Sequence, residues 1–318
     1  MKNDLVVKDN ALINASYNLE LTEQRLILLS IIRARETGQG ISSDSKLEIH
    51  ASDYASRFDV TKEAAYNALK NAVNNLFERK FSFKEIHKDT NKEIVVKSRW
   101  VSRIAYIDDL ATLEVTFAPD VVPLITRLEK HFTSYQLKQV AQLTSKYAIR
   151  LYEFLIAWRG IGKTPIISLS EFREKLGLEI NEYQKMVNFK SRVLEPALKQ
   201  INELTDINVK YEQYKNGRSI SGLSFTFKLK KTESLPLEKD PNDSDFFIQM
   251  TDAQRHMFAH KLSELPEMIN YSKGTESYQQ FAVRIAEMLQ DPKQIKELYP
   301  YLKKVGYIKS NKKDTING

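Results

Sequence analysis

Two stretches of this chain open with the same signature, LTEQRLILLSII at residues 21–32 and LTSKYAIRLYEFLI at residues 143–156. Each starts with hydroxyl residues that can cap a helix and continues with closely spaced apolar residues, so each predicts a capped apolar helix. We expect Thr22 to be the N-cap of the first helix. Because similar signals follow both stretches in the same order, the chain contains an internal duplication.

After its first helix, each copy has a glycine-containing loop and a short run of alternating apolar residues, at 47–49 and at 166–169. A serine, an acid and an aromatic residue come next, beginning at Ser52 and at Ser170. A serine N-cap with an acid in the first turn predicts a short helix, because the helix dipole favours negative charge there.

A longer helix then follows a turn in each copy. In the first copy it covers residues 62–77, with Thr61 as N-cap and an apolar stripe of Ala65, Leu69, Ala72, Val73 and Leu76. In the second copy the stripe consists of Phe189, Val193, Ala197, Ile201 and Leu204. Pro196 lies inside this second helix and removes a backbone donor, so we expect a kink there.

Both copies end in strands rich in β-branched and aromatic residues, at 81–83, 94–96, 104–106 and 113–117 and then at 207–211 and 223–227. Helix, short strand, helix, turn, longer helix and β-hairpin is the element order of a winged helix. We therefore predict an α+β fold class, with two tandem winged-helix (helix-turn-helix plus β-hairpin) domains and a small helical C-terminal appendix. The predicted bounds are 1–125 and 126–231 for the two domains, 232–250 for a linker and 251–318 for the appendix.

The composition excludes several classes of protein. The 318 residues are 42% hydrophobic and include no cysteine, so disulfides and thiolate catalysis are excluded. The longest apolar stretch, residues 26–32, is far shorter than the roughly 20 residues of a membrane helix. The N-terminus also lacks an apolar core of signal-peptide length, so we expect a cytoplasmic protein with no membrane partner.

Two motifs raise enzymatic or metal-binding alternatives. AWRGIGKT at residues 157–164 satisfies a relaxed phosphate-loop pattern, but an apolar helix precedes it and Pro165 follows it, which inverts the context that nucleotide binding requires. His256 and His260 are four residues apart without a third ligand, so we interpret them as exposed helical histidines. We predict no catalytic residue, no cofactor and no metal, and therefore no enzyme.

The charge pattern favours double-stranded DNA as a partner. The net charge is +7, and Lys and Arg exceed Asp and Glu locally by ten to five in residues 60–103, by five to one in 138–163 and by six to one in 209–231. These excesses fall on the longer helices, on the hairpins and on the first helix of the second copy, which are the parts of a winged helix that face a duplex.

Within these regions we assign a role to each candidate. The planar guanidinium of Arg192 can donate to guanine O6 and N7 at the same time. The other candidates at the start of the second long helix are Lys190, Ser191, Lys185 and Asn188. At the start of the preceding helix, the candidates for phosphate contacts are Ser145, Lys146 and Arg150. The candidates at the tip of the second hairpin are Lys215 and Arg218. The equivalents in the first copy are Lys62, Tyr66, Asn67, Lys70, Asn71, Arg99 and Arg103.

In combination, the motifs of residues 5–231 resemble the RepB/RepE/π-type initiators of theta-replicating bacterial plasmids. The motifs are NALI at 10–13, the two opening stretches, NFK at 188–190, VKYE at 209–212 and KNGR at 215–218. The resemblance implies that a monomer binds directly repeated origin sequences, called iterons, through both domains and starts replication. It places major-groove contacts of the second long helix at Lys185, Lys190, Ser191 and Arg192.

The resemblance also implies partners: the host initiator protein and the replicative helicase, and a second copy of the chain. By the same resemblance, we expect the homodimer to form largely through the first domain and to act as a repressor or to couple origins. A winged-helix transcriptional repressor without initiator activity stays open as an alternative. A duplication within one chain fits a long asymmetric site better than a palindrome. A nucleotide-dependent enzyme that uses Gly160 to Thr164 is the second alternative.

Overall fold

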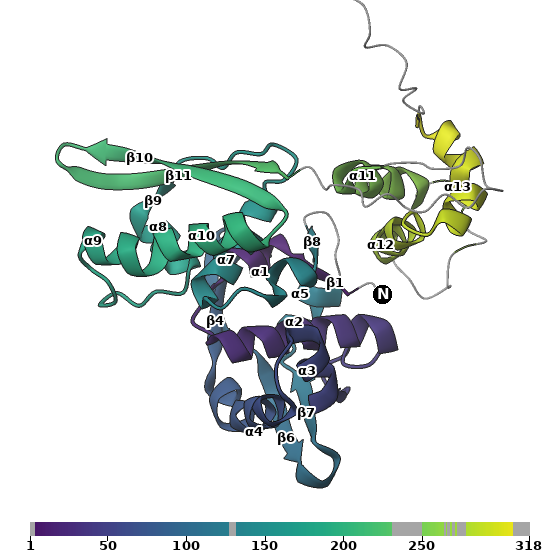
Figure 1. Cartoon of the computed structure of the whole chain (residues 1–318), viewed down its shortest axis with the longest axis horizontal. Helices are drawn as coiled ribbons and strands as arrows, with labels where there is room; N and C mark the ends of the chain where they lie inside the picture. The colour runs from purple at the N-terminus through teal and green to yellow at the C-terminus, as the bar shows by residue number, and fades with distance from the viewer. Residues whose placement is uncertain are drawn as a thin grey trace, which may run out of the picture. The chain divides into compact units, whose positions relative to one another are not determined.

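The computed structural model describes residues 4–126, 132–230, 250–263, 265, 268, 271 and 278–307. The chain divides into two compact units, Met1–Thr232 and Glu233–Gly318 (Figure 1). The first unit contains both copies of the duplication, and the second contains the C-terminal helices. The predicted linker at 232–250 lies outside the described residues except for Met250, and the polar tail after residue 307 also lies outside them.

The first copy is a winged helix with two hairpins. Its helices are α2 (Leu21–Thr37), α3 (Ala51–Phe58) and α4 (Lys62–Glu78), and its strands are β3 (Leu47–His50), β4 (Lys80–Ile86), β5 (Glu93–Arg99), β6 (Val101–Ile107) and β7 (Thr112–Phe117). Strands β3, β7 and β6 form one antiparallel sheet, and β4 and β5 form another with the short strand β2 (Ser16–Tyr17). The short helix η1 (Asp108–Leu110) makes the turn between β6 and β7.

The second copy repeats this element order. Its helices are α7 (Lys146–Ile156), α8 (Leu169–Lys175), α9 (Met186–Phe189) and α10 (Glu195–Leu204), and its strands are β9 (Ile167–Ser168), β10 (Ile207–Asn216) and β11 (Ser219–Leu229). The sheet order is β10-β11-β9, with the long β10–β11 hairpin as the wing. The predicted α+β class with two winged helices is thus confirmed.

The helix starts follow the predicted patterns with three corrections. Thr61 caps α4 as expected, since its hydroxyl accepts from the amide of Ala64. The prediction of Thr22 as a cap is wrong: α2 begins after Glu20, whose amide donates to the Glu23 carboxylate at 2.8 Å. The predicted caps of the two short helices are also wrong. His50 and Ser168 hold these positions, because their side chains accept from amides of the first helical turn.

Pro196 changes the long helix of the second copy as its chemistry requires. A π-helical turn, η2 (Lys190–Leu194), joins α9 to α10 immediately before the proline. The amide of Glu195 donates to the Lys190 carbonyl, five residues back, so the helix shifts its hydrogen-bond register where Pro196 has no N–H to give. The predicted stripe is buried except for Leu204, which is 39% exposed and was wrongly assigned to it.

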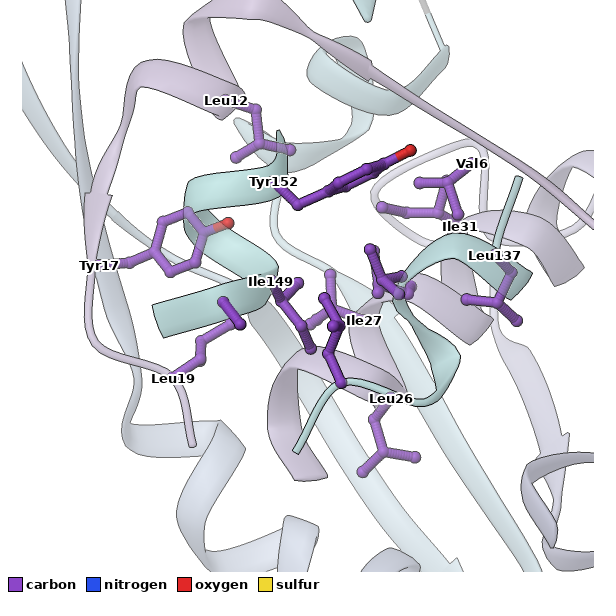
Figure 2. Packing of buried hydrophobic residues seen from close by; sticks show 14 of the residues in the cluster. Val6, Leu12, Tyr17, Leu19, Leu26, Ile27, Ile31, Leu137, Ile149 and Tyr152 are labelled. Atoms are coloured by element: carbon purple, nitrogen blue, oxygen red, sulfur yellow. The ribbon is translucent and has the colours of Figure 1, made fainter. Parts of the chain in front are cut away.

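The two winged helices share one apolar core. Figure 2 shows Ile149 and Tyr152 of α7 among Leu12, Leu26 and Ile27 of the first copy, and all five are buried. The strand β1 (Leu5–Asp9) pairs antiparallel with β8 (Phe132–Gln136), which follows the predicted domain boundary at 125/126. The helices α1 (Asn10–Asn14), α5 (Val121–Thr126) and α6 (Lys138–Ala141) complete this unit.

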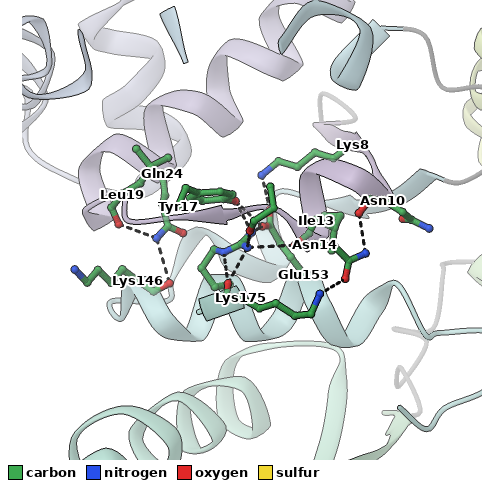
Figure 3. Close-up of polar contacts among 12 residues, drawn as sticks. Lys8, Asn10, Ile13, Asn14, Tyr17, Leu19, Gln24, Lys146, Glu153 and Lys175 are labelled. Carbon is green, nitrogen blue, oxygen red and sulfur yellow. Dashed lines mark hydrogen bonds and ion pairs between the residues drawn. The ribbon is translucent and has the colours of Figure 1, made fainter. Parts of the chain in front are cut away.

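A buried charge cluster lies within this core and is formed by Lys8, Tyr17, Tyr135, Arg150 and Glu153. Figure 3 shows Lys8, Tyr17 and Glu153 of this cluster. Glu153 accepts from Lys8 at 2.6 Å and from the Tyr135 hydroxyl at 2.5 Å. Arg150 donates to the Tyr17 hydroxyl, to backbone carbonyls of both copies and to Glu153 at 3.3 Å. Burial alone raises the pKa of Glu153, but the charges of Lys8 and Arg150 outweigh it and the pKa is lowered. The cluster therefore joins the two copies through buried ion pairs.

Gly177 allows the two copies to approach closely. Its φ is +77°, and a Cβ there would lie 2.0 Å from the Tyr17 carbonyl oxygen. Nearby, Lys175 donates to Asn14 at 2.9 Å across the same contact. Any side chain at position 177 would force this contact apart, so the position requires glycine.

The second unit is a small helical body. Its helices are α11 (Asp252–Ser263), α12 (Tyr278–Met288) and α13 (Pro292–Lys304), as the helical pattern of the appendix predicts. Phe258, Leu262, Phe281, Ile285 and Leu298 are buried in a core of its own. Among the described residues of the chain, no helix is both long and apolar enough to cross a membrane.

Candidate nucleic-acid interface

The start of the second long helix presents a cationic surface. Phe189 is fully buried, with its ring 6.3 Å from that of Phe172, and this anchors one side of α9 to the core. The opposite side faces solvent, where Lys185, Asn188, Ser191 and Arg192 are exposed and Lys190 is half-buried. We call these five residues the second reading face.

The cations of the second reading face have no acidic partner. Within the described parts of the chain, no ion pair or side-chain hydrogen bond involves Lys185, Lys190 or Arg192. Their positive charges are therefore available to an anion from outside the protein. Arg192 keeps its whole planar fork of donors for a bidentate acceptor.

The wing adds two further exposed cations. Gly217 has a φ of +61°, which suits the tight turn between β10 and β11. Lys215 and Arg218 flank it, both exposed, and no described acid pairs with either of them. The hairpin also changes register between Tyr214 and Lys215, which increases the twist of the strand close to its tip.

The equivalent helix of the first copy, α4, differs in its electrostatics. We call its candidates Lys62, Tyr66, Asn67, Lys70 and Asn71 the first reading face. Asp108, from the turn between β6 and β7, accepts from the Tyr66 hydroxyl at 2.5 Å and from Lys70 at 3.0 Å. These two hydrogen bonds lower the pKa of Asp108, which is therefore ionised at neutral pH. Lys62, Asn67 and Asn71 are exposed.

The two candidate arginines of the first-copy strands are also paired. Arg99 donates to the Phe77 carbonyl at 2.7 Å and to Glu78 at 3.2 Å. Arg103 forms an ion pair with Glu114, which also contacts Lys46 at 3.4 Å. Both arginines thus bind acids of their own domain.

The candidates at the start of α7 all make contacts within the protein. The prediction for Arg150 is wrong, because its side chain is 2% exposed and belongs to the buried charge cluster. Lys146 is half-buried and pairs with Glu20 at 2.8 Å and with Asn18 at 2.9 Å, and Ser145 is the helix N-cap. The sequence does carry a signal for this: α7 is apolar or aromatic on nearly every side, which is typical of a central buried helix.

The loop at residues 157–164 lacks the geometry of a phosphate loop. The amides of Ile161 and Gly162 both donate to the Trp158 carbonyl within the loop. The Thr164 side chain is buried, and its hydroxyl donates to the Pro165 carbonyl and accepts from the Phe225 amide. The loop thus connects α7 to the sheet through internal bonds. The described residues also contain no group of three or more His, Asp or Glu that suits a metal ion.

Models of two protein families match this chain in order. The model described as "Initiator Replication protein, WH1" matches residues 5–156, and "Initiator Rep protein, WH2" matches residues 168–227. A "Replication initiation protein" of Escherichia coli is 28% identical over 243 residues, which are 75% of this chain and 74% of that protein.

Solved structures are similar as well. The crystal structure of the Pi initiator protein in complex with iteron DNA matches with a TM-score of 0.58 and 24% identity, over 73% of this chain and 99% of that one. This match shows the same fold. The WH1 domain of a replication protein isolated from a multiple sclerosis patient is 60% identical over 39% of this chain and 93% of that one, with a TM-score of 0.33.

Proposed function

The chain belongs to the family of replication initiator proteins with the winged-helix domains WH1 and WH2, and on this premise we propose that it binds the iterons of a plasmid origin and starts replication there. The second reading face carries this proposal, because its cations have no partner within the described protein. Duplex DNA offers both the phosphates that such charges neutralise and the base edges that a helix N-terminus reaches in the major groove.

The proposal assigns separate roles to the parts of the interface. Arg192 binds guanine O6 and N7, while Lys185, Asn188, Lys190 and Ser191 contact neighbouring bases or phosphates. The wing cations Lys215 and Arg218 bind the backbone of the adjacent turn. The first reading face contacts a second groove segment of the same repeat, so one monomer covers one iteron.

We further propose that a second copy binds through the first domain and that the resulting dimer represses. In the described part of the β2-β4-β5 sheet, β5 is an edge strand, and it carries Val95 with 62% of its surface exposed. An edge strand with an apolar side chain is suited to pairing with another chain. The resemblance to plasmid initiators supports recruitment of the host initiator protein and replicative helicase, in the bacterial cytoplasm, with no catalytic step of its own.

Footprinting on the DNA that flanks the gene tests this function. We expect the purified full chain to protect several direct repeats of equal length. A single protected palindrome would instead indicate a transcriptional repressor, and the absence of any protected site would contradict the proposal. Transformation with a plasmid that carries only the protected region and the gene then tests initiation, because only an initiator supports replication of that plasmid.

A further inference from the structure

The two most exposed large hydrophobic side chains in the described residues lie close together in sequence. Ile180 is 87% exposed and Val187 is 75% exposed, and both belong to the segment that leads into the second reading face. Exposed apolar side chains stabilise a folded chain little, since their burial is what lowers the free energy. Val187 lies between Lys185 and Lys190, for which the described residues provide no acidic partner, and this combination suits a ligand that has both negative charge and an apolar group.

The helix geometry places Val187 among the residues that face DNA. Val187 lies in the first turn of α9, two positions before the buried Phe189, and points to the opposite side. Ser191 follows Val187 by four residues, and Arg192 follows Asn188 by four, so the two pairs form adjacent columns on one exposed surface.

The chemistry of the major groove indicates which DNA group an apolar side chain such as Val187 can contact. Base edges there present hydrogen-bond donors and acceptors and one apolar substituent, the C5-methyl of thymine. We propose that Val187 contacts a thymine methyl and specifies thymine at one position of each iteron, next to the bases that Asn188 and Arg192 read. This inference rests on the proposed function, because it requires that the second reading face enters a major groove.

Replacing thymine by uracil removes only that methyl group and therefore tests the contact directly. Each thymine of one iteron is replaced in turn, and the affinities of the full chain and of Val187→Ala are measured by fluorescence anisotropy at fixed salt. We expect one replacement to weaken wild-type binding about fourfold, the effect of one buried methyl group. Val187→Ala should bind the thymine iteron about as weakly and should not respond to that replacement.

Ile161→Ala is the matched control, since Ile161 is 72% exposed but lies in the loop after α7. This variant should keep the wild-type response to uracil. If every uracil replacement that weakens the wild type weakens Val187→Ala equally, the inference is wrong while iteron binding stands. If the wild-type chain protects no repeat at all, the proposed function itself fails. Because Val187 is exposed, its replacement leaves folding intact, and circular dichroism checks this.

Discussion

The first and second reading faces lie on equivalent helices of the two copies, but they differ in whether their cations are paired with acids of the protein. On α4, Lys70 and Tyr66 bind Asp108 of the β6–β7 turn, whereas Arg192 and Lys190 of the second copy have no described acidic partner. A count of lysines and arginines along the chain does not distinguish them. The difference teaches that the cations available to DNA are decided by acids that the fold brings from elsewhere.

This difference predicts unequal roles for the two domains. A cation that is paired with a carboxylate must break that ion pair before it binds a phosphate, so it contributes less binding free energy than a cation that is only hydrated. We therefore expect the second domain to supply most of the base recognition and the first to supply weaker, less specific contacts.

The largest effect should come from disrupting the buried charge cluster, which connects the two winged-helix copies. Glu153→Gln leaves Lys8 and Arg150 buried without a counter-charge and should lower the free energy of unfolding by about 3–5 kcal/mol. The folded-state pKa of Glu153 is lowered, so its contribution is present above the unfolded pKa and is lost only as the pH falls through the folded value. Urea denaturation at neutral pH, followed by circular dichroism, measures the change.

Glu171→Gln is the control for this variant. Glu171 pairs with Lys175 through a side chain that is 55% exposed, and such exposed pairs contribute little to stability. If both variants unfolded at the same urea concentration, the buried charge cluster would not hold the domains together.

The next largest effect comes from comparing alanine variants of the two reading faces. Arg192→Ala should cost about 1–3 kcal/mol of iteron affinity and relax the preference at one base pair. Lys70→Ala should change affinity less than about twofold, because Lys70 already binds Asp108 at 3.0 Å. Anisotropy titrations on the iteron and on its single-base variants measure both. Equal losses would show that the pairing seen on α4 does not matter for DNA.

The smallest effect sharpens the comparison by making the first face resemble the second. Asp108→Asn removes the carboxylate that binds Tyr66 and Lys70 and should raise DNA affinity by about two- to threefold. If Lys70 then gains one phosphate contact, the dependence of log affinity on log salt should steepen by about 0.9. Asp109→Asn, in the same exposed turn, is the control for a general loss of negative charge.

Local chemistry explains what the sequence could predict. The Thr61 cap, the turn at Gly217 and the stripe of α4 each depend on residues within a few positions of one another. For this reason the duplication and the order of two winged helices could be predicted from the sequence, as could the exposed cations of the second reading face.

Contacts between distant residues explain what could not be predicted. The apolar character of α7 indicates that Arg150 is buried, but it does not reveal the partners, because the Ile13 and Ala15 carbonyls that Arg150 binds lie more than a hundred positions away. Asp108 reaches Lys70 across 38 positions. The Glu20 cap was missed because the reciprocal bond with Glu23 competes with the more common hydroxyl cap at Thr22.

The pairing of β1 with β8 ties the two domains together during synthesis. The ribosome releases Leu5–Asp9 early, but this strand has no partner strand until Phe132–Gln136 emerges. Lys8 has no counter-charge until Glu153 has been translated. A fragment that stops at residue 125 lacks both partners, whereas one that ends at Ile156 retains them. The nascent first domain therefore completes its fold only after the ribosome has translated the opening helix of the second.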